Sequence, residues 1–590
     1  MPEQRDDGAM EDQPAGGSGK RQSRRPGRAE RQPHPAWRTP EAPGGPGESG
    51  GSGKPEGSGG SRESDGSGAS GHPVPSGRPG PAGVRPAEPG WVALIRPADP
   101  APVPPATLWG VLGTGLAAAL LLGDGLGIGL LITALPAALA AYAAARTAGR
   151  QARPWTVAWA LGCLALLAVP ALRDAGWTSV PAVFAAVGLA ALALYGSRTW
   201  PGVLLSPLGF LDAAPTGLAW AWQGLRGLGS GTRDRWWPLV RAAAVAAVLL
   251  VLFGALFASA DAAFADLLGG LAPDVSVEDG PVRVLLFLFG GVAAVAAARA
   301  AAGPLCWDRI RIAPAKPRSR AEWALPLIVL DLLFAGFIAV QLTVLFGGYD
   351  RVLERTGLTR AEYARQGFWQ LLWATLLTLV VIALALRRSP RSGPRDRSLV
   401  RAVLGTLCVL TLVVVASALR RMDLYVDAYG LTRLRLSVAA VELWLGLVIV
   451  LIIAAGVFGA RWLPRAVVAS AGAAVLAFGL ASPDGLIAER NVARFERAAE
   501  QDRGGVIDLA YVQSLSADAV PALDRLPEPY RSCALRGIND DLAGRGRTPW
   551  YATSLGEQRA MRILQRCPVT APYEVCSGLG TFADRYASSY

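Results

Sequence analysis

Long apolar runs separated by short charged breaks are the feature that most limits what this chain can fold into. A run of about twenty apolar residues crosses the hydrocarbon core of a bilayer as a helix, because lipid offers no hydrogen bonds to an unpaired backbone. The sequence therefore predicts an all-α, polytopic membrane helix bundle with about eleven transmembrane helices. The predicted spans lie near residues 107–122, 126–145, 155–172, 178–196, 237–258, 282–302, 324–346, 368–386, 399–419, 434–458 and 464–481.

Two stretches of this bundle leave alternatives open. The first two spans are short, and only Gly123, Asp124 and Gly125 separate them, so they form either a tight hairpin, which we favour, or one long interrupted helix. Small residues would permit close contact in a hairpin; they are Gly110, Gly113, Gly115, Gly127 and Gly129. Residues 203–222 are apolar too, but prolines and Asp212 interrupt them, so we expect an interfacial or re-entrant segment.

The chain divides into three regions by composition. Residues 1–90 are rich in Gly, Pro, Ser and Arg with almost nothing to bury, and we expect a disordered tail. The bundle follows over residues 107–481, and residues 482–590 show mixed polar and apolar stretches that predict a small helical region. The net charge of +12 lies mainly in short loops, which is typical of membrane orientation, so the partner we expect is the lipid bilayer and not nucleic acid.

Basic residues in the short loops predict the orientation, because Lys and Arg are retained on the cytoplasmic face. Arginines follow the second, fourth, sixth and eighth spans, whereas the loop after the fifth span is acidic and includes Asp261 and Asp266. Loops after the seventh and ninth spans carry arginines as well as acids. The pattern places the N-terminus in the cytoplasm and, with an odd number of spans, residues 482–590 outside the cell membrane.

Ionisable groups inside a span are costly in lipid, so each is a candidate for function. Asp331 lies in the first half of the seventh span, with Gln341 ten residues further on, and Glu442 lies at a similar depth in the tenth span. Carboxylates that face a cavity could carry protons or ions. The alternative is an interhelical hydrogen bond or an ion pair with an interfacial arginine.

The most distinctive string is RRMDLYVDAYGLTRLR at residues 420–435. We expect it to form a loop at the membrane edge. Asp423 and Asp427 would share a face if this part is helical, and the arginines could bind a phosphate, a lipid headgroup or those same carboxylates. The candidate cluster comprises Arg421, Asp423, Asp427, Tyr429, Thr432, Arg433 and Arg435.

Histidine and cysteine usage narrows the chemistry. Both histidines, His34 and His72, lie in the predicted tail, which excludes His-based triads and His-ligated zinc from the folded part. We predict no catalytic residue, no metal site and no cofactor. Beyond the last span, Cys567 and Cys576 are near enough in sequence to form an external disulfide, with Cys533 as a competing partner.

Four strings resemble a known group of proteins: SADAAF (259–264), YARQGFWQL (363–371), DLYVDAYGLTRLR (423–435) and DAVPAL (518–523). They resemble the uncharacterised bacterial membrane proteins known as domains of unknown function four-one-seven-three and four-one-five-three. The resemblance extends from near Trp109 to Gln565 and implies a multi-pass cell-membrane protein. It supplies no activity, substrate or catalytic residue.

Three classes of function remain open. A sensor or envelope scaffold, which we favour, would use the external C-terminal helices as the docking surface for an envelope or signalling protein. A transporter or lipid-handling protein would need Asp331, Glu442 or Arg433 to line a cavity, and no internal repeat is apparent. A membrane enzyme would be left with carboxylate, Ser, Tyr or Lys chemistry.

Overall fold

The computed structural model describes residues 95, 100–227, 280–310, 319–346, 368–389, 393–501, 507–546 and 548–580, with isolated positions between 242 and 261. The predicted tail, most of the fifth predicted span and the loop after the seventh lie outside these residues. Every regular element within the described ranges is a helix, which confirms the all-α fold.

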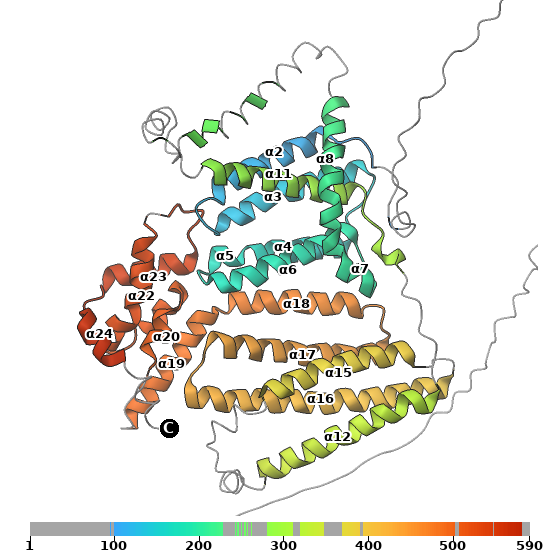
Figure 1. Ribbon diagram of the computed structural model, residues 1–590, viewed down its shortest axis with the longest axis vertical. Helices are drawn as coiled ribbons and strands as arrows, with labels where there is room; N and C mark the ends of the chain where they lie inside the picture. Colours follow the sequence, from blue (N-terminus) through green and yellow to red (C-terminus); the bar gives the residue numbers. More distant parts are fainter. Residues whose placement is uncertain are drawn as a thin grey trace, which may run out of the picture. The chain divides into compact units, whose positions relative to one another are not determined.

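The apolar helices lie side by side (Figure 1). Ten of the described helical stretches are long and apolar enough to cross a membrane, and nine of them coincide with predicted spans. The first predicted span is a shorter apolar helix of 17 residues, α2. The bounds are α2 (Pro105–Leu121), α3 (Ile128–Thr147), α4 (Pro154–Leu167), α5 (Val169–Leu172), α6 (Gly176–Tyr195), α11 (Gly280–Ala302), α12 (Arg320–Phe346), α15 (Phe368–Arg388), α16 (Pro394–Tyr429), α17 (Arg433–Phe458) and α18 (Leu463–Leu480).

Small residues bring the first helices together. A Cβ on Gly110 of α2 would overlap that of Ala140 on α3, so the two backbones approach closely and the predicted hairpin is confirmed. Gly115 instead faces Phe287 of α11. Large apolar side chains point away from the bundle, as shown by the exposed fraction of Phe184 (74%). Such outward leucines and phenylalanines suit a lipid environment.

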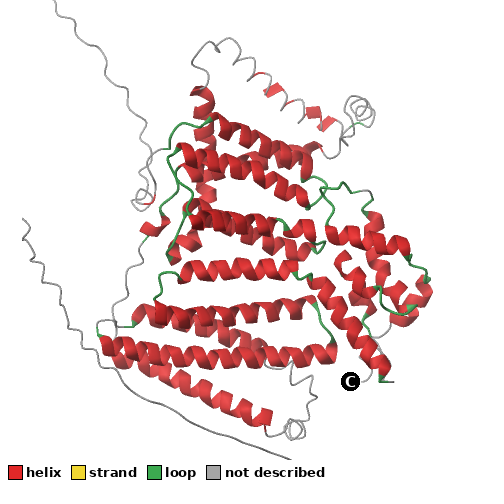
Figure 2. Cartoon of the chain, turned by 180° about the vertical axis from the view of Figure 1, so that it is seen from behind, coloured by secondary structure: helices red, strands yellow, loops and turns green. Residues whose placement is uncertain are grey.

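The interrupted stretch after α6 is helical throughout. It forms α7 (Trp200–Leu205), a single turn of 3-10 helix η1 (Ser206–Leu208) and α8 (Gly209–Gly227). Residues 200–226 qualify as the tenth candidate span by length and composition, which the prediction had not expected. Figures 1 and 2 show α8 running across α2, α3 and α11. The interfacial placement of this stretch therefore stays a prediction.

The described part of the C-terminal region forms seven helical elements around a core of its own. These are α19 (Pro483–Glu500), α20 (Leu509–Gln513), η4 (Ala517–Ala519), α21 (Val520–Leu523), α22 (Tyr530–Gly544), α23 (Leu555–Arg566) and α24 (Tyr573–Gly580). Their core is apolar and includes the fully buried Ile487, Val492, Leu523 and Leu535. All of these elements lie at one end of the apolar helices (Figures 1 and 2).

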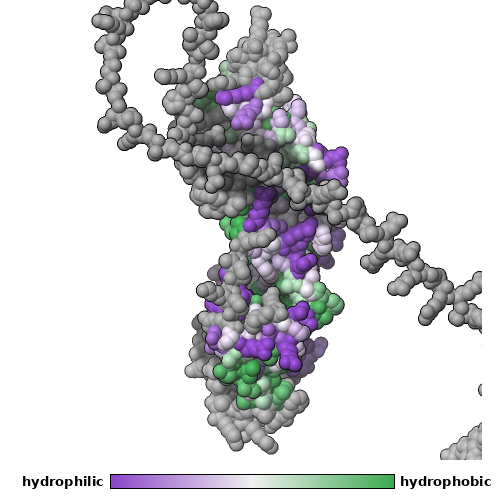
Figure 3. Space-filling model, turned by 90° about the vertical axis from the view of Figure 1, so that its right-hand side faces the viewer, coloured by the Kyte–Doolittle hydropathy of each residue, from purple (hydrophilic) through white to green (hydrophobic). Residues whose placement is uncertain are grey.

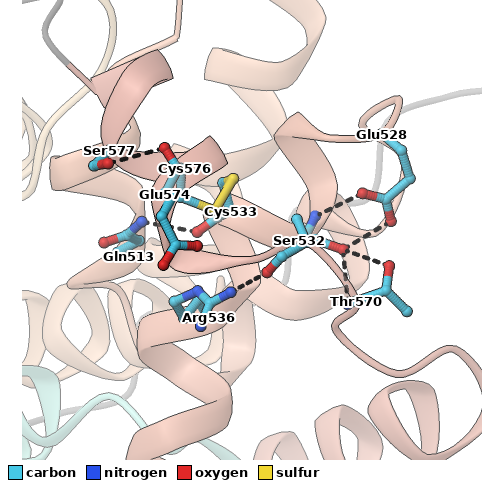
Figure 4. Close-up of a disulfide and its surroundings, with 10 residues drawn as sticks. Gln513, Glu528, Ser532, Cys533, Arg536, Thr570, Glu574, Cys576 and Ser577 are labelled. Atoms are coloured by element: carbon cyan, nitrogen blue, oxygen red, sulfur yellow. Dashed lines mark hydrogen bonds between the residues drawn. A yellow bond between two sulfur atoms is a disulfide. The ribbon is translucent and has the colours of Figure 1, made fainter.

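A disulfide between Cys533 and Cys576 joins α22 to α24 (Figure 4). The favoured pairing of Cys567 with Cys576 was therefore wrong, and the competing partner Cys533 is the correct one. Packing decides this, because α22 and α24 bring the two α-carbons to 5.2 Å, whereas Cys567 ends α23 as an exposed free thiol. Gln513 of α20 donates a 2.8 Å hydrogen bond to the Cys533 carbonyl beside the disulfide.

Short connections between the described helices lie at two ends of the bundle (Figure 1). At the end away from the C-terminal helices, Arg150 donates to the carbonyls of Ala301 and Leu194, which close α11 and α6. Arg465, at the start of α18, donates to the carbonyl of Gly196 at 2.8 Å. Figure 3 looks onto this end and shows hydrophilic side chains among apolar patches. The opposite end carries the C-terminal helices.

Candidate functional site

Buried polar contacts concentrate where the C-terminal helices meet the bundle, a region called the seam below. The seam contains three contacts. Each is centred on one carboxylate or on a pair of carboxylates that accept hydrogen bonds from several helices or loops. The residues of the seam are Asp124 and Arg283, Arg173 to Trp177, Arg433, Asp484, Ser516, Asp518, Arg545, Tyr551 and Glu557. Most of these side chains are drawn from different helices.

Asp484 is the centre of the first contact and is completely buried. Its carboxylate accepts two hydrogen bonds from the Arg433 guanidinium, at 2.9 Å from Nε and 2.6 Å from Nη2. The Trp177 indole N–H donates at 3.1 Å and the Ser516 backbone N–H at 2.9 Å. Burial alone would raise the pKa of Asp484, but Arg433 first, and Ser516 after it, hold the pKa below its ordinary value. One carboxylate thus ties together α6, α17, α19 and the loop before η4.

Asp518 and Asp174 make the second contact. Each carboxylate accepts a hydrogen bond from a backbone N–H on the other side of the seam. The Asp518 carboxylate accepts from the backbone N–H of Asp174 at 3.0 Å and lies 3.8 Å from the Arg173 guanidinium. The Asp174 carboxylate accepts from the Ala517 N–H at 3.1 Å and from Arg545 at 2.8 Å. The short connection between α5 and α6 is therefore fastened to the C-terminal helices by side chains from both partners.

Asp124, in the turn between α2 and α3, makes the third contact. The Tyr551 hydroxyl donates to its carboxylate at 2.7 Å, and Arg283 at the start of α11 donates at 3.3 Å. The Gly129 N–H donates to the Tyr551 carbonyl at 3.0 Å. A Cβ on Gly127 would overlap that carbonyl, so only glycine allows this approach. The hydrogen bond to Asp124 raises the pKa of Tyr551.

Acidification is expected to strengthen the seam. Burial raises the pKa of Asp518 to about 6, although Arg173 and two backbone amides oppose the shift, and burial beside Asp174 also raises the pKa of Glu557. A group whose pKa is raised on docking binds its proton in the docked state first, so the docked state gains stability as the pH falls through about 6. The gain is about 1.4 kcal/mol for each pH unit down to the ordinary value of Asp518.

Hydrogen exchange at the amide of Ala175, which bonds to Asp518 at 3.4 Å, measures this effect in the purified protein between pH 7.5 and 5. Exchange rates must first be corrected for the intrinsic pH dependence of amide exchange. Protection is expected to rise by roughly 1–2 kcal/mol at pH 5. The Asp518→Asn variant should lose most of the rise, and an unchanged rise in that variant would contradict the assignment to Asp518.

The Gly556→Ala substitution is expected to strain the seam. Gly556 lies in the first turn of α23, and a Cβ there would overlap the Asp518 carboxylate, which is held in place by the amides of Asp174 and Ala175. Overpacking of this kind destabilises by about 1–3 kcal/mol. Gly578→Ala on α24 meets no atom within 4 Å and serves as the control. Thermal unfolding should show a lower midpoint for the first variant alone, and equal midpoints would refute the clash.

The predicted cluster at residues 421–435 contributes mainly through Arg433. We expected a loop at the membrane edge here, but α16 continues to Tyr429. Asp423 and Asp427 therefore lie on one face of a helix, and both are exposed. Of the three partners expected for the arginines of this string, the two carboxylates are not the one that Arg433 meets, because Arg433 pairs with Asp484.

The other members of the cluster shape the turn between α16 and α17. The Thr432 hydroxyl caps α17 by accepting from the Arg435 N–H at 3.4 Å. The Arg435 guanidinium lies over the Tyr425 ring, 4.2 Å from its centroid, and 5.9 Å from that of Tyr429. Arg421 is half-buried on α16. These roles are structural, and they orient Arg433 towards Asp484.

The intramembrane candidates lie in the half of the bundle built from α12, α15, α16 and α17. Glu442 is fully buried and accepts a 3.0 Å hydrogen bond from Thr375, and Gln341 accepts one of 2.7 Å from Ser417. Glu442 thus makes an interhelical hydrogen bond of the kind that the alternative for the carboxylates expects, and Gln341 makes another. Among the described residues, Oε2 of Glu442 and Oδ1 of the buried Asp331 have no hydrogen-bond partner, and no hydrogen bond or ion pair joins the two carboxylates.

Sequence reasoning missed most of the seam. Trp177, Asp174, Asp484 and Asp518 were not candidates, although Asp518 opens the string DAVPAL and Asp484 stands in the first turn of α19. An acid at a helix start is common, because it interacts favourably with the exposed N–H groups there. That signal alone does not reveal a buried partner. In the part of the chain that the structure describes, no group of three His, Cys, Asp or Glu side chains is placed to hold a metal ion.

Span-length apolar helices with a helical domain fastened to one end define a multi-pass integral membrane protein. Residues 160–526, more than half of the chain, match the family described as Domain of unknown function (DUF4153), and the chain belongs to that family. The match confirms the second of the two families that the strings resemble, over a narrower range. Comparison with curated proteins gave no match, and comparison with solved structures gave none.

Proposed function

We propose that this protein is a sensor or scaffold of the cell envelope, with its C-terminal helices on the outer side of the cell membrane and its N-terminus in the cytoplasm. The observation that carries the proposal is a disulfide-bonded helical domain fastened to one end of the bundle through the buried carboxylates of Asp484 and Asp518. Such a domain can present a surface to an envelope or signalling protein while it stays coupled to the membrane helices.

Two independent features support this sidedness. The end of the bundle away from the C-terminal helices carries Arg150, Arg153, Arg198 and Arg465 in or beside its short connections, as expected of a cytoplasmic face. The disulfide belongs to the opposite end, and disulfides persist in oxidising compartments outside the cytoplasm.

Coupling across the seam supports a sensing role. Asp484 bonds to Trp177 at the start of α6, to Arg433 at the start of α17 and to Ser516 in the C-terminal region. A buried carboxylate that loses such donors is strongly destabilised, so the domain and the two helix ends should move together. A partner or ligand that shifts the domain would then alter the bundle.

Sidedness can be tested with Cys567, an exposed free thiol. A membrane-impermeant thiol reagent is expected to label it in intact cells, and Cys567→Ser should lose that label. A second thiol introduced by Gln151→Cys, in the connection between α3 and α4, should react only after lysis. Labelling of Gln151→Cys and not of Cys567 in intact cells would reverse the proposed orientation.

The role itself can be tested by complementation of a strain that lacks the gene. A chain that ends at Ala481 is expected to fail, whereas full-length Glu442→Gln and Asp331→Asn should restore the envelope phenotype at normal protein levels. If the truncated chain restores the phenotype, the sensor or scaffold proposal is wrong.

A transporter is the second candidate, and one observation favours it. Glu442 and Asp331 each keep a buried carboxylate oxygen without a hydrogen-bond partner among the described residues, and such groups in a membrane commonly carry protons or ions. This role requires Glu442→Gln or Asp331→Asn to abolish a proton-dependent uptake or efflux while the C-terminal helices remain folded. An unchanged flux in both variants would remove this candidate.

A further inference from the structure

A cavity of about 520 Å³ opens within the seam beside Asp518. Its walls come from the end of α5, the junction of α18 with α19, the segment around α21 and the first turns of α23. Leu172 and Ala481, which end membrane helices, line one side. The cavity therefore lies at the level where the bundle ends, which is the level of lipid headgroups for a helix that spans the bilayer. Its volume is within the range of small-molecule sites.

Three arginines line this cavity, one from the bundle and two from the C-terminal helices. Arg173 lies 3.8 Å from Asp518 and donates to the Leu480 carbonyl, while its buried Nε has no hydrogen-bond partner in the described part of the chain. Arg525 lies 3.9 Å from Glu496, a long contact between exposed groups.

Arg559, on the exposed side of α23, forms no ion pair with any residue that the structure describes. The acidic side chains of the lining are Asp518, which is occupied by Arg173 and two backbone amides, and Glu489 on α19. Guanidinium donors thus remain available to an oxyanion.

Apolar side chains stand next to these arginines. Leu486 and Leu555 line the same cavity with exposed fractions of 38% and 55%. Exposed leucines beside the guanidinium of Arg559 and the loosely paired guanidinium groups of Arg173 and Arg525 suit a ligand with a charged head and an apolar body. A phospholipid has both parts, and basic pockets at the ends of membrane helices are suited to lipid headgroups.

We propose that this cavity binds the phosphate of an anionic phospholipid headgroup, with Arg559, Arg525 and Arg173 as its cationic contacts. The ligand bridges the bundle and the C-terminal helices, so its binding stabilises the docked domain. The inference deepens the proposed sensing function by naming a ligand class. It rests on that proposal in one respect only: the proposed orientation decides which leaflet of the membrane supplies the lipid.

The test uses the purified full-length chain in detergent. Its thermal unfolding is followed against added phosphatidylglycerol, phosphatidylcholine and inorganic phosphate. Phosphatidylglycerol should raise the midpoint in a saturable manner. Arg559→Gln should weaken its apparent affinity about tenfold, which corresponds to about 1.4 kcal/mol, because it removes a charge-assisted hydrogen bond to the phosphate. Arg562→Gln, which alters an exposed arginine on the same helix that does not line the cavity, should leave the affinity unchanged.

The outcomes separate clearly. Equal weakening in Arg559→Gln and Arg562→Gln, or no response of the wild type to either phosphatidylglycerol or phosphate, overturns the site. If inorganic phosphate raises the unfolding midpoint as much as phosphatidylglycerol does, the site stands and its ligand is free phosphate. If Arg559→Gln unfolds without ligand at a lower midpoint, Arg525→Gln repeats the measurement. Binding that persists while the Cys567 labelling reverses would refute the proposed orientation and leave this inference intact.

Discussion

Arg433→Met is expected to release the C-terminal helices from the bundle. The substitution removes both guanidinium hydrogen bonds from Asp484, whose carboxylate is completely buried, and leaves it with the Trp177 and Ser516 donors alone. Removing one partner of a buried ion pair costs about 3–5 kcal/mol, mainly because the remaining charge stays buried without compensation. The loss should appear in limited proteolysis as rapid cleavage near residues 482–516, and in thermal unfolding as a lower midpoint.

An asymmetry between the partners makes this prediction sharper. Arg433 is 33% exposed at its side chain, so water can solvate it when Asp484→Asn removes the carboxylate, and that variant should be less damaging. Replacing both residues with apolar ones should cost less than Arg433→Met alone, since no buried charge remains. Arg420→Met, an exposed arginine in the same string, is the control and should behave as wild type. Equal damage from Arg433→Met and Arg420→Met would contradict the role of Asp484.

Cys533→Ser is expected to have the second-largest effect. The disulfide with Cys576 closes a loop with a sequence separation of 43, and both sulfur-bearing side chains belong to the core of the C-terminal helices. Loss of a native disulfide from a small domain outside the cytoplasm typically costs 2–5 kcal/mol. Cys567→Ser changes an exposed thiol and should be neutral.

Protease resistance of residues 483–580 in membranes, with and without reductant, measures this effect. Reductant should mimic Cys533→Ser in the wild type and add nothing to that variant. Mass spectrometry of the non-reduced protein should recover a peptide pair that contains Cys533 and Cys576. A pair that contains Cys567 instead would contradict the disulfide.

The membrane-spanning architecture was largely predictable from the sequence because it depends on local information. A span needs only a long apolar run, so nine predicted spans coincide with helices long enough to cross a membrane. The helix at residues 200–227 was harder, because Pro207 and Pro215 suggested a break. Proline in fact allows a 3-10 turn at the first site and lies inside α8 at the second. The extension of α16 to Tyr429 was hidden by its charged last turns.

The candidate site was only partly predictable, because its partners are distant in the sequence. Arg433 was singled out by the density of arginines around it, but its partner Asp484 lies 51 residues away, and nothing local distinguishes that acid from others at helix starts. The bond between Asp518 and the Asp174 amide joins residues 344 apart. Cys576 likewise pairs with the more distant Cys533 and not with its near neighbour Cys567.

By itself, the sequence determined that the chain is a helical membrane bundle with a polar C-terminal region, because hydrophobic burial and backbone satisfaction in lipid act on each segment separately. The tertiary structure alone decided which carboxylates are buried, which arginine meets each of them, and which cysteines pair. These outcomes depend on how the ends of α5, α6, α17, α18 and α23 converge, and that convergence follows from packing between segments that are remote along the chain.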